Sequence, residues 1–413
     1  MMNLIISFSS PKNGGDIVQK ISKTKEEFDQ FFDERLSVKI EQLEENREAV
    51  KKNRNKQLLV IGLVMLPPIV LTQIIDQYAL FFFIIAFAIL IFGVFKLSKT
   101  YQAFTGVMKQ EITQEIVTFI NPDFRYEPKE YIPESKFIDS NIFVKKPDKY
   151  RGDDLIWGYV YDHDVSNTDK NPELVTHGAK KENESLEQVQ KKFKQDNGNS
   201  PIDETPRTKI SFSEVEAIDV QSRPGEGSNT HEEAIFKGLF FDVDFNKDFE
   251  GVTIILPRNN VLFDFKKIER TLEQPELDEI ELDNIEFSER FTVMTSDEVK
   301  ARYILTPAFM NKILSFVDIT KERVTERPQN KPANTNSSRD KRRESRIAKR
   351  LIPYFSFKEG KMYFLLNTSQ LHFEFNMDKK PDKESLYYDF QDINQSLELV
   401  EELDLNLKLW NKS

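Results

Sequence analysis

Six side chains between Asp162 and Glu173 alternate in the way that the ligands of a calcium-binding loop do. Such a loop needs glycine at its sixth position for a sharp turn and helices on both sides. Asn167 stands at that position, and the preceding run IWGYVY has the pattern of a strand. The sequence therefore favours a polar turn over a calcium site. The six residues are Asp162, Asp164, Ser166, Thr168, Lys170 and Glu173.

Other short motifs for chemistry are also incomplete. The run Asp242–Asp248 has Thr253 where a calcium loop has its bidentate glutamate, and Gly225–Gly227 lacks the rest of a phosphate-binding pattern. His231–Glu233 has no second histidine, and the chain contains no cysteine. We therefore predict no catalytic residue, no cofactor and no metal ligand. Whether the chain is an enzyme is left uncertain, with the balance against it.

A basic stretch, RDKRRESRIAKR, stands out from a chain whose net charge is −11. Three interpretations are open: a solvated loop, a contact with anionic lipid headgroups, and a contact with RNA or an acidic protein. The acidic balance argues against nucleic acid as a general partner. The candidate lipid or partner contacts are Arg339, Lys341, Arg342, Arg343, Arg346, Lys349 and Arg350.

The elements that must position these residues begin with two apolar runs, Leu58–Ile75 and Ala79–Phe95. A signal peptide would lie nearer the N-terminus. Each run has the length of a membrane span, and the short connection carries Asp76 alone as a charge. We predict a transmembrane hairpin over residues 57–97, with spans of about 58–75 and 79–97. Pro67 and Pro68 predict a kink in the first span, sheltered by the second.

Cations flank the hairpin at both of its outer ends and are absent from the connection between the two spans. Lys51, Lys52, Arg54 and Lys56 precede it, Lys96 and Lys99 follow it, and the connection between the spans has none. The positive-inside rule places both termini in the cytoplasm, which predicts a multi-pass protein of the plasma membrane.

Helical patterns lie on both sides of the hairpin. Residues 1–56 form a predicted amphipathic arm, whose stripe could pair with a second copy or pack on the chain's own body. Residues 98–122 form a predicted juxtamembrane helix. The stripe of the arm contains Ile21, Phe28, Phe32, Leu36, Ile40 and Leu43.

Residues 123–413 predict a strand-rich α+β cytosolic domain. Alternating or aromatic runs bounded by turn residues indicate strands, among them three in the segment 351–375, LIPYFSFK, KMYFLLN and LHFEF. Thr306 and Pro307 predict the start of one helix that splits the sheet. Polar insertions occupy about 164–207 and 326–345. The fold class is thus an α+β membrane protein, a two-span hairpin flanked by cytosolic helices.

Two blocks, AIFKGLFFDVDFNKDFEGVTIILP and ERFTVMTSDEVKARYILTPAFMNKIL, resemble the bacterial membrane family called domain of unknown function 3137. FSFKEGKMYFLL and the FEF near Phe373 also look like its closing strands. The resemblance implies a bacterial source and the same order of helix, hairpin and cytosolic domain, and brings no catalytic residue. The matching residues are Phe236, Gly238, Phe240, Phe245, Gly251, Thr253, Phe291, Val293, Asp297, Ala301, Arg302, Tyr303, Leu305, Thr306 and Pro307.

Within the second block, Asp297 and Arg302 lie across a predicted strand-turn, where they form either a structural ion pair or a recognition pair, and we favour the structural one. For the whole chain we expect a membrane-anchored binding or scaffold domain. The alternatives are a membrane-bound enzyme acting on lipid or envelope precursors, and an oligomeric channel or membrane-remodelling unit. Expected partners are the bilayer, anionic headgroups, and a membrane protein or a second copy.

Overall fold

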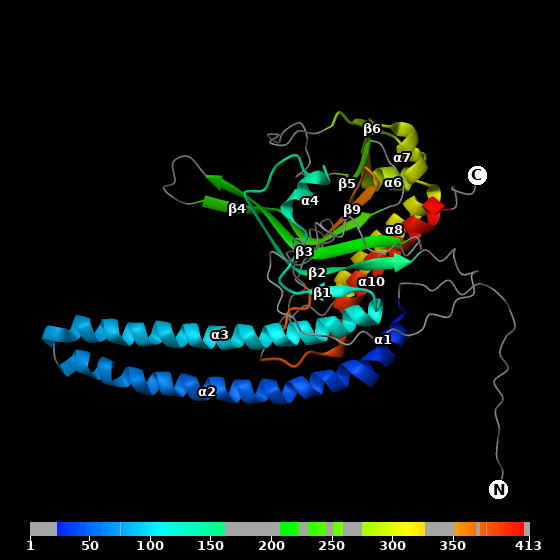
Figure 1. Ribbon diagram of the computed structural model, residues 1–413. Helices are drawn as coiled ribbons and strands as arrows, with labels where there is room; N and C mark the ends of the chain where they lie inside the picture. Colours follow the sequence, from blue (N-terminus) through cyan, green and yellow to red (C-terminus); the bar gives the residue numbers. More distant parts are fainter. Residues whose placement is uncertain are drawn as a thin grey trace, which may run out of the picture. The chain divides into compact units, whose positions relative to one another are not determined.

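The computed structural model describes residues 23–74, 76–161, 207–222, 230–244, 251–258, 275–326, 352–368, 372–376 and 378–408 (Figure 1). The calcium-loop candidate 162–173, the glycines of 225–227 and the basic stretch 339–350 lie outside the described residues. So do the two predicted insertions, apart from Arg207 and Glu326 at their edges.

The N-terminal part is helical throughout. A capping box between Thr24 and Glu27 starts α1 (Lys25–Phe31), which passes through the π-helical turn η1 (Phe32–Leu36) into α2 (Ser37–Ile74). The short η2 (Asp76–Tyr78) leads into α3 (Ala79–Ile120). α2 continues as a helix through Pro67 and Pro68. Each of the two long helices therefore combines a predicted span with the neighbouring polar segment.

α2 and α3 lie side by side in antiparallel directions (Figure 1). Ion pairs join Arg35 to Glu115, at 3.1 Å, and Lys39 to Glu111. Nearer the connection, a Cβ added to Gly93 would come within 2.6 Å of the Ile61 side chain. Glycine at this position allows the two helices to approach closely.

The apolar stripe of α1 and the first half of α2 packs on the chain's own body. Phe28 stacks on Phe390 with a ring-centroid distance of 4.7 Å, and Phe31 stacks on Phe119 at 4.2 Å. The Lys23 backbone N–H also donates to the Asn394 side chain at 2.8 Å. These contacts agree with the interpretation that the stripe packs within one chain.

The described strands form one nine-stranded sheet in the order β1-β2-β3-β4-β9-β8-β5-β7-β6. Each strand pair whose register is described is antiparallel. The strands are β1 (Arg125–Glu127), β2 (Lys149–Tyr161), β3 (Arg207–Ser222), β4 (Thr230–Asp244), β5 (Val252–Pro257), β6 (Asp278–Ile280), β7 (Phe291–Thr295), β8 (Tyr354–Lys358) and β9 (Lys361–Asn367).

Helices cover both faces of the central strands, so β5, β8 and β9 are buried almost continuously. On one face Phe137 of α4 (Glu134–Asp139) packs on Phe240, with 6.0 Å between the ring centroids. On the other face Phe316 of α8 (Pro307–Glu326) packs on Phe364, with 5.8 Å between the ring centroids. Burial on both faces explains why the central residues of these strands are mostly apolar, since neither face meets water. The helices are α4 (Glu134–Asp139), α6 (Ile285–Arg290), α7 (Glu298–Ile304), α8 (Pro307–Glu326) and α10 (Lys383–Lys408).

The sequence anticipates these elements unevenly. Most of the runs predicted as strands lie in β2 to β5, β8 and β9. The predicted start of a helix at Thr306 and Pro307 is confirmed, because α8 begins at Pro307 and the Phe309 N–H donates to Thr306 Oγ1 at 3.2 Å. The prediction of one helix in the sheet domain is wrong, because α4, α6, α7 and α10 accompany α8.

The strand predicted in LHFEF is also wrong for the described residues 372–376. Phe373 has a positive φ of 51°, which interrupts an extended backbone. Its N–H donates to the Asp389 side chain at 3.0 Å, and the N–H of His372 donates to Glu214. Side chains of β3 and α10 thus replace the partners that a neighbouring strand would supply.

Gly238 gives a test of the sheet's central pairing, because β4 lies between β3 and β9 there. Its φ is +157°, and a Cβ at this position would collide with the carbonyl oxygen of Leu366. Gly238→Ala is expected to destabilise the fold by about 2 kcal/mol or more, measured by thermal denaturation of the purified protein. Gly106→Ala is the control. It lies in α3 with open space around it and should stabilise by up to about 1 kcal/mol. Equal effects of the two changes would contradict the described packing.

Candidate functional site

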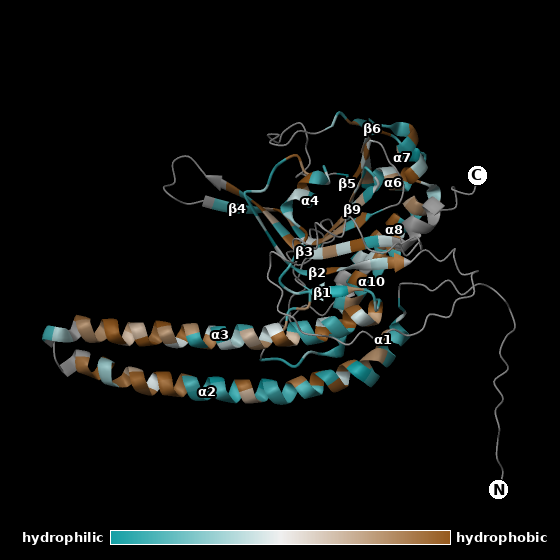
Figure 2. Cartoon of the chain, in the orientation of Figure 1, coloured by the Kyte–Doolittle hydropathy of each residue, from teal (hydrophilic) through white to brown (hydrophobic). Residues whose placement is uncertain are grey.

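Two features of the described chain call for a functional explanation, and the first is an exposed apolar surface. Large apolar side chains are exposed on the connected ends of α2 and α3, the brown segments in Figure 2. Both helices are long and apolar enough to cross a membrane, and of their most apolar 18 residues 0% are buried in the first helix and 11% in the second. The rest of the chain would cover a core helix, whereas the side chains of this surface are exposed.

We call this surface the apolar belt. Its members on α2 are Leu58, Leu59, Val60, Leu63, Val64, Leu66, Ile69 and Val70, and on α3 they are Leu80, Phe81, Phe83, Ile84, Phe87, Leu90, Ile91, Phe92, Val94 and Phe95.

The second feature is a set of ionisable groups where α3 meets the sheet. We call it the ionic network: Lys109, Asp153, Asp154, Glu214, His372 and Asp392. Lys109 Nζ lies 2.7 Å from Asp154, 2.9 Å from Asp153 and 3.2 Å from Glu374. One lysine of α3 therefore holds two adjacent carboxylates of β2 and one from the segment after β9.

The backbone of β2 makes this convergence possible. Consecutive strand residues ordinarily point to opposite faces. Asp154, however, has a φ of 59°, in the left-handed region that residues other than glycine rarely adopt. Tyr126 of β1 then donates its hydroxyl to Asp154 Oδ1 at 2.6 Å. Asp154 is thus buried with a hydroxyl on one oxygen and an ammonium group by the other.

Burial has opposing effects on these groups. It raises the pKa of Asp154 to about 7, although Lys109 acts to lower that pKa. Burial also disfavours the charged ammonium of Lys109, but the coulombic attraction of Asp154, with that of Asp153, outweighs this effect and raises the Lys109 pKa. With a pKa of about 7, Asp154 is only partly ionised at neutral pH, and the positive charge of Lys109 is what keeps that pKa from rising further.

His372 links the other half of the network. Its backbone N–H and its ring Nδ1 both contact Glu214 Oε1 at 2.5 Å, and its Nε2 lies 3.0 Å from Asp392 of α10. Burial acts to lower the pKa of His372, but the hydrogen bonds to Asp392 and Glu214 outweigh it and raise the pKa to about 10. His372 is accordingly a buried cation between two carboxylates.

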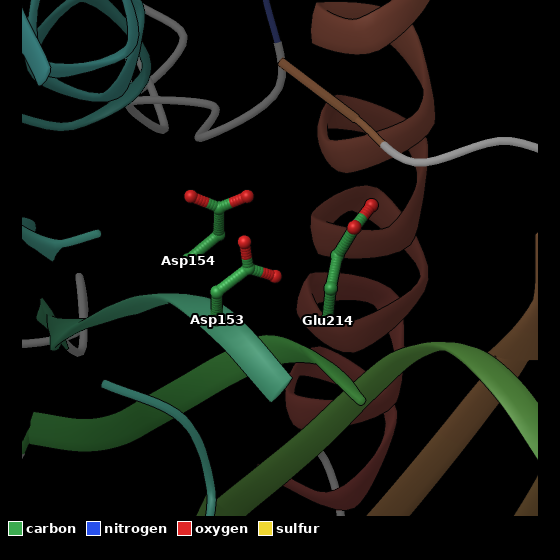
Figure 3. Close-up of side chains that lie close together, drawn as sticks. All are labelled: Asp153, Asp154 and Glu214. Atoms are coloured by element: carbon green, nitrogen blue, oxygen red, sulfur yellow. The ribbon is translucent and has the colours of Figure 1, made fainter. Parts of the chain in front are cut away.

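Three of these carboxylates could hold a metal ion. Ligand oxygens of Asp153, Asp154 and Glu214 lie within 4.8 Å of one another, and Figure 3 shows the three groups side by side. Lys109 already contacts two of them, so a metal would compete with a cation that the fold supplies. The arrangement is best explained as an internal ionic link between α3, the sheet and α10.

The pair predicted from the sequence has separate partners. Asp297 is the N-cap of α7 and accepts from the Lys300 N–H at 3.0 Å. Arg302 lies in the last turn of α7 and pairs with Glu298 at 2.7 Å. Among the described residues no hydrogen bond or ion pair joins Asp297 to Arg302, because a helix start, not a strand-turn, separates them.

Sequence reasoning did not find the ionic network. The available signals were two acidic residues at the start of a strand-like run, YRGDDLIW, and a histidine inside the apolar run LHFEF. Neither signal identifies a partner, since Lys109, Asp154 and His372 are far apart in the sequence.

Residues 234–325 match the model of the family described as Protein of unknown function (DUF3137). This match confirms the family resemblance over the segment from within β4 to the last residues of α8. The comparisons with curated proteins and with solved structures found no match.

His372→Gln tests the buried histidine through the pH dependence of stability. The folded pKa of about 10 lies above the ordinary 6.5, so the stabilisation is complete below pH 6.5 and is lost as pH rises towards 10. The variant should be less stable by about 3 kcal/mol near pH 6.5, with a deficit that shrinks at higher pH, in denaturant unfolding. His231→Gln, at an exposed position of β4, is the control. A deficit that grows with pH would contradict the assignment.

Lys109→Met tests the other half. The folded pKa of Asp154 lies above 3.8, so the unfolded chain ionises first and stability falls as pH rises towards about 7. Without Lys109 this pKa should rise further and the fall should continue beyond pH 7. The variant should therefore lose about 3 kcal/mol above that pH and less below it, in the same unfolding assay.

Two variants serve as controls for Lys109→Met. Lys109→Arg keeps the charge and should retain part of the lost stability. Lys312→Met removes a partly exposed pair with Glu398 and should cost under about 1 kcal/mol. A loss at Lys109 no larger than at Lys312 would show that the network contributes little.

Proposed function

We propose that this chain is a bacterial plasma-membrane protein whose α2 and α3 cross the bilayer as a hairpin and present the strand-rich domain at the cytosolic face for binding or scaffolding. The apolar belt carries the proposal. Its exposed side chains require an apolar surrounding, and a bilayer supplies one around both helices at once.

The length of the belt suits a bilayer. Leu58–Ile74 and Ala79–Phe95 each rise roughly 25 Å at about 1.5 Å per residue, close to a hydrocarbon core of about 30 Å. The family resemblance supports the bacterial setting and the order of helix, hairpin and domain. Cations at the far ends of the two apolar runs, with none in their connection, favour cytosolic termini.

The domain would be held by a helix in place of a flexible linker. α3 runs unbroken from the belt to Ile120, and its last turns contact β1. Lys109 and its carboxylate partners attach the same helix to β2. A domain fixed at the bilayer meets lipids or membrane proteins at high effective concentration, so weak contacts suffice for binding. The basic stretch Arg339–Arg350 is proposed as one such contact.

Protease protection in oriented membrane vesicles tests the proposal. We expect a tag placed after Ser413 to be cleaved in inside-out vesicles alone, and a tag inserted after Gln77 to be cleaved in right-side-out vesicles alone. Extraction with alkaline carbonate should leave the protein in the membrane. Cleavage of both tags from the same side would refute the hairpin, and release by carbonate would refute insertion.

A further inference from the structure

We infer that four lysines at the cytosolic end of the apolar belt form a binding surface for anionic phospholipid headgroups. The inference rests on the proposed function, because it takes the belt to be the membrane-spanning part. We call the surface the lysine collar; its members are Lys52, Lys56, Lys96 and Lys99.

The register of α2 and α3 brings the four lysines to one level. The ion pair of Arg35 with Glu115 and the contact of Ile61 with Gly93 fix an antiparallel alignment. In this alignment Lys52 lies opposite Lys99, and Lys56 lies opposite Lys96. In the sequence, the two apolar runs separate Lys52 from Lys99 and Lys56 from Lys96. The packing of α2 against α3 is what brings the members of each pair to the same level.

The level of the collar is that of the headgroups. Lys56 precedes Leu58 by roughly 3 Å of helix rise, and Lys96 directly follows Phe95; Lys52 and Lys99 lie within about 9 Å of the belt. The polar layer of a bilayer is several ångströms thick on each side of the hydrocarbon. Lysine side chains can extend along that layer while their stems stay near apolar atoms.

The charges of the collar are uncompensated within the described chain. All four lysines are exposed, and none forms an ion pair with a described residue. Asp76, at the opposite end of the belt, is the single acidic residue between Ala49 and Gln110. Lys39, in the first turn of α2 and distant from the belt, differs in this respect because it pairs with Glu111. Four exposed cations that pair with no described carboxylate fit a partner that carries negative charge at the same level.

The strand-rich domain adds a second tier of charge. Asp378 pairs with Arg54 of α2 at 3.0 Å, which brings exposed Lys379 and Lys380 close to the collar. Arg47 is the main cause of the lowered pKa of Glu44, and the charge of Lys380 also lowers it. Lys380 therefore lies near Glu44, which is farther from the belt than Arg54 is. We expect these two lysines to act weakly, through a field that decays over about 10 Å.

Phosphatidylglycerol serves as the probe, with phosphatidylcholine as the zwitterionic competitor. The full chain in mixed micelles of both lipids is analysed by native mass spectrometry, and the ratio of bound lipids is measured. The wild type should retain phosphatidylglycerol preferentially. Each lysine near an anionic surface contributes about five-fold in affinity, equivalent to about 1 kcal/mol. The variant with all four collar lysines changed to glutamine should lose at least about ten-fold of the preference.

Matched variants separate the collar from general charge effects. Lys379→Gln with Lys380→Gln should lower the preference by less than the same number of collar changes. Lys129→Gln with Lys149→Gln removes two charges from the strand-rich domain, as many as Lys52→Gln with Lys56→Gln removes from the collar, and should leave the preference unchanged. Adding free glycerol phosphate should not displace the lipid, because the collar binds headgroups held in a bilayer or micelle.

Three results would overturn the inference. They are no preference in the wild type, a four-lysine variant that behaves like the wild type, or a loss in the Lys129 and Lys149 control as large as that of Lys52→Gln with Lys56→Gln. These results differ from a failure of the proposed function. A protein released by alkaline carbonate loses both proposals. A protein retained in the membrane without a lipid preference loses this inference alone.

Discussion

A single unbroken helix, α3, has to satisfy two environments, and the rest of the described structure depends on how it does so. Its first half exposes large apolar side chains, whereas Met108, Ile112 and Ile116 in its second half are buried. Because α3 is one continuous helix, the two surroundings are matched by a change in its residue types along its length. The first half is apolar all round, and the second half has one buried apolar face. The arm, the sheet edge and α10 all assemble on the second half.

Burying that second half brings ionisable groups out of water. Isolated buried charges are costly, and the fold answers by pairing them. Lys109 of α3 pairs with Asp154 of β2, and His372 contacts Glu214 of β3 and Asp392 of α10. Each buried cation therefore bridges elements that are distant in the sequence. Such links contribute geometry more than net stability, because the desolvation of both partners offsets their attraction. They specify how the helices and the sheet fit together.

The sequence predicts those features that depend on local pattern. Uniform apolarity located both long helices, alternation located β3 and β4, and Thr306 with Pro307 located the start of α8. It did not predict the ionic network, whose members meet through tertiary packing, nor the irregular backbone at Phe373, which depends on carboxylates of β3 and α10. Asp297 illustrates the same limit. Its spacing from Arg302 predicts a pair, but its role as a helix cap depends on where α7 begins.

The contact between the two ends of the described chain has a consequence for the order of assembly. Lys23 and Asn394 are joined by two hydrogen bonds, and Phe28 stacks on Phe390. During synthesis α1 leaves the ribosome long before its partner α10 exists. At about 5–20 residues per second, the delay is on the order of tens of seconds. Phe31 can stack on Phe119 as soon as α2 and α3 pair, whereas the contact of Phe28 with Phe390 has to wait until α10 has been made. The covering of Phe28 by α10 is therefore a late step of assembly.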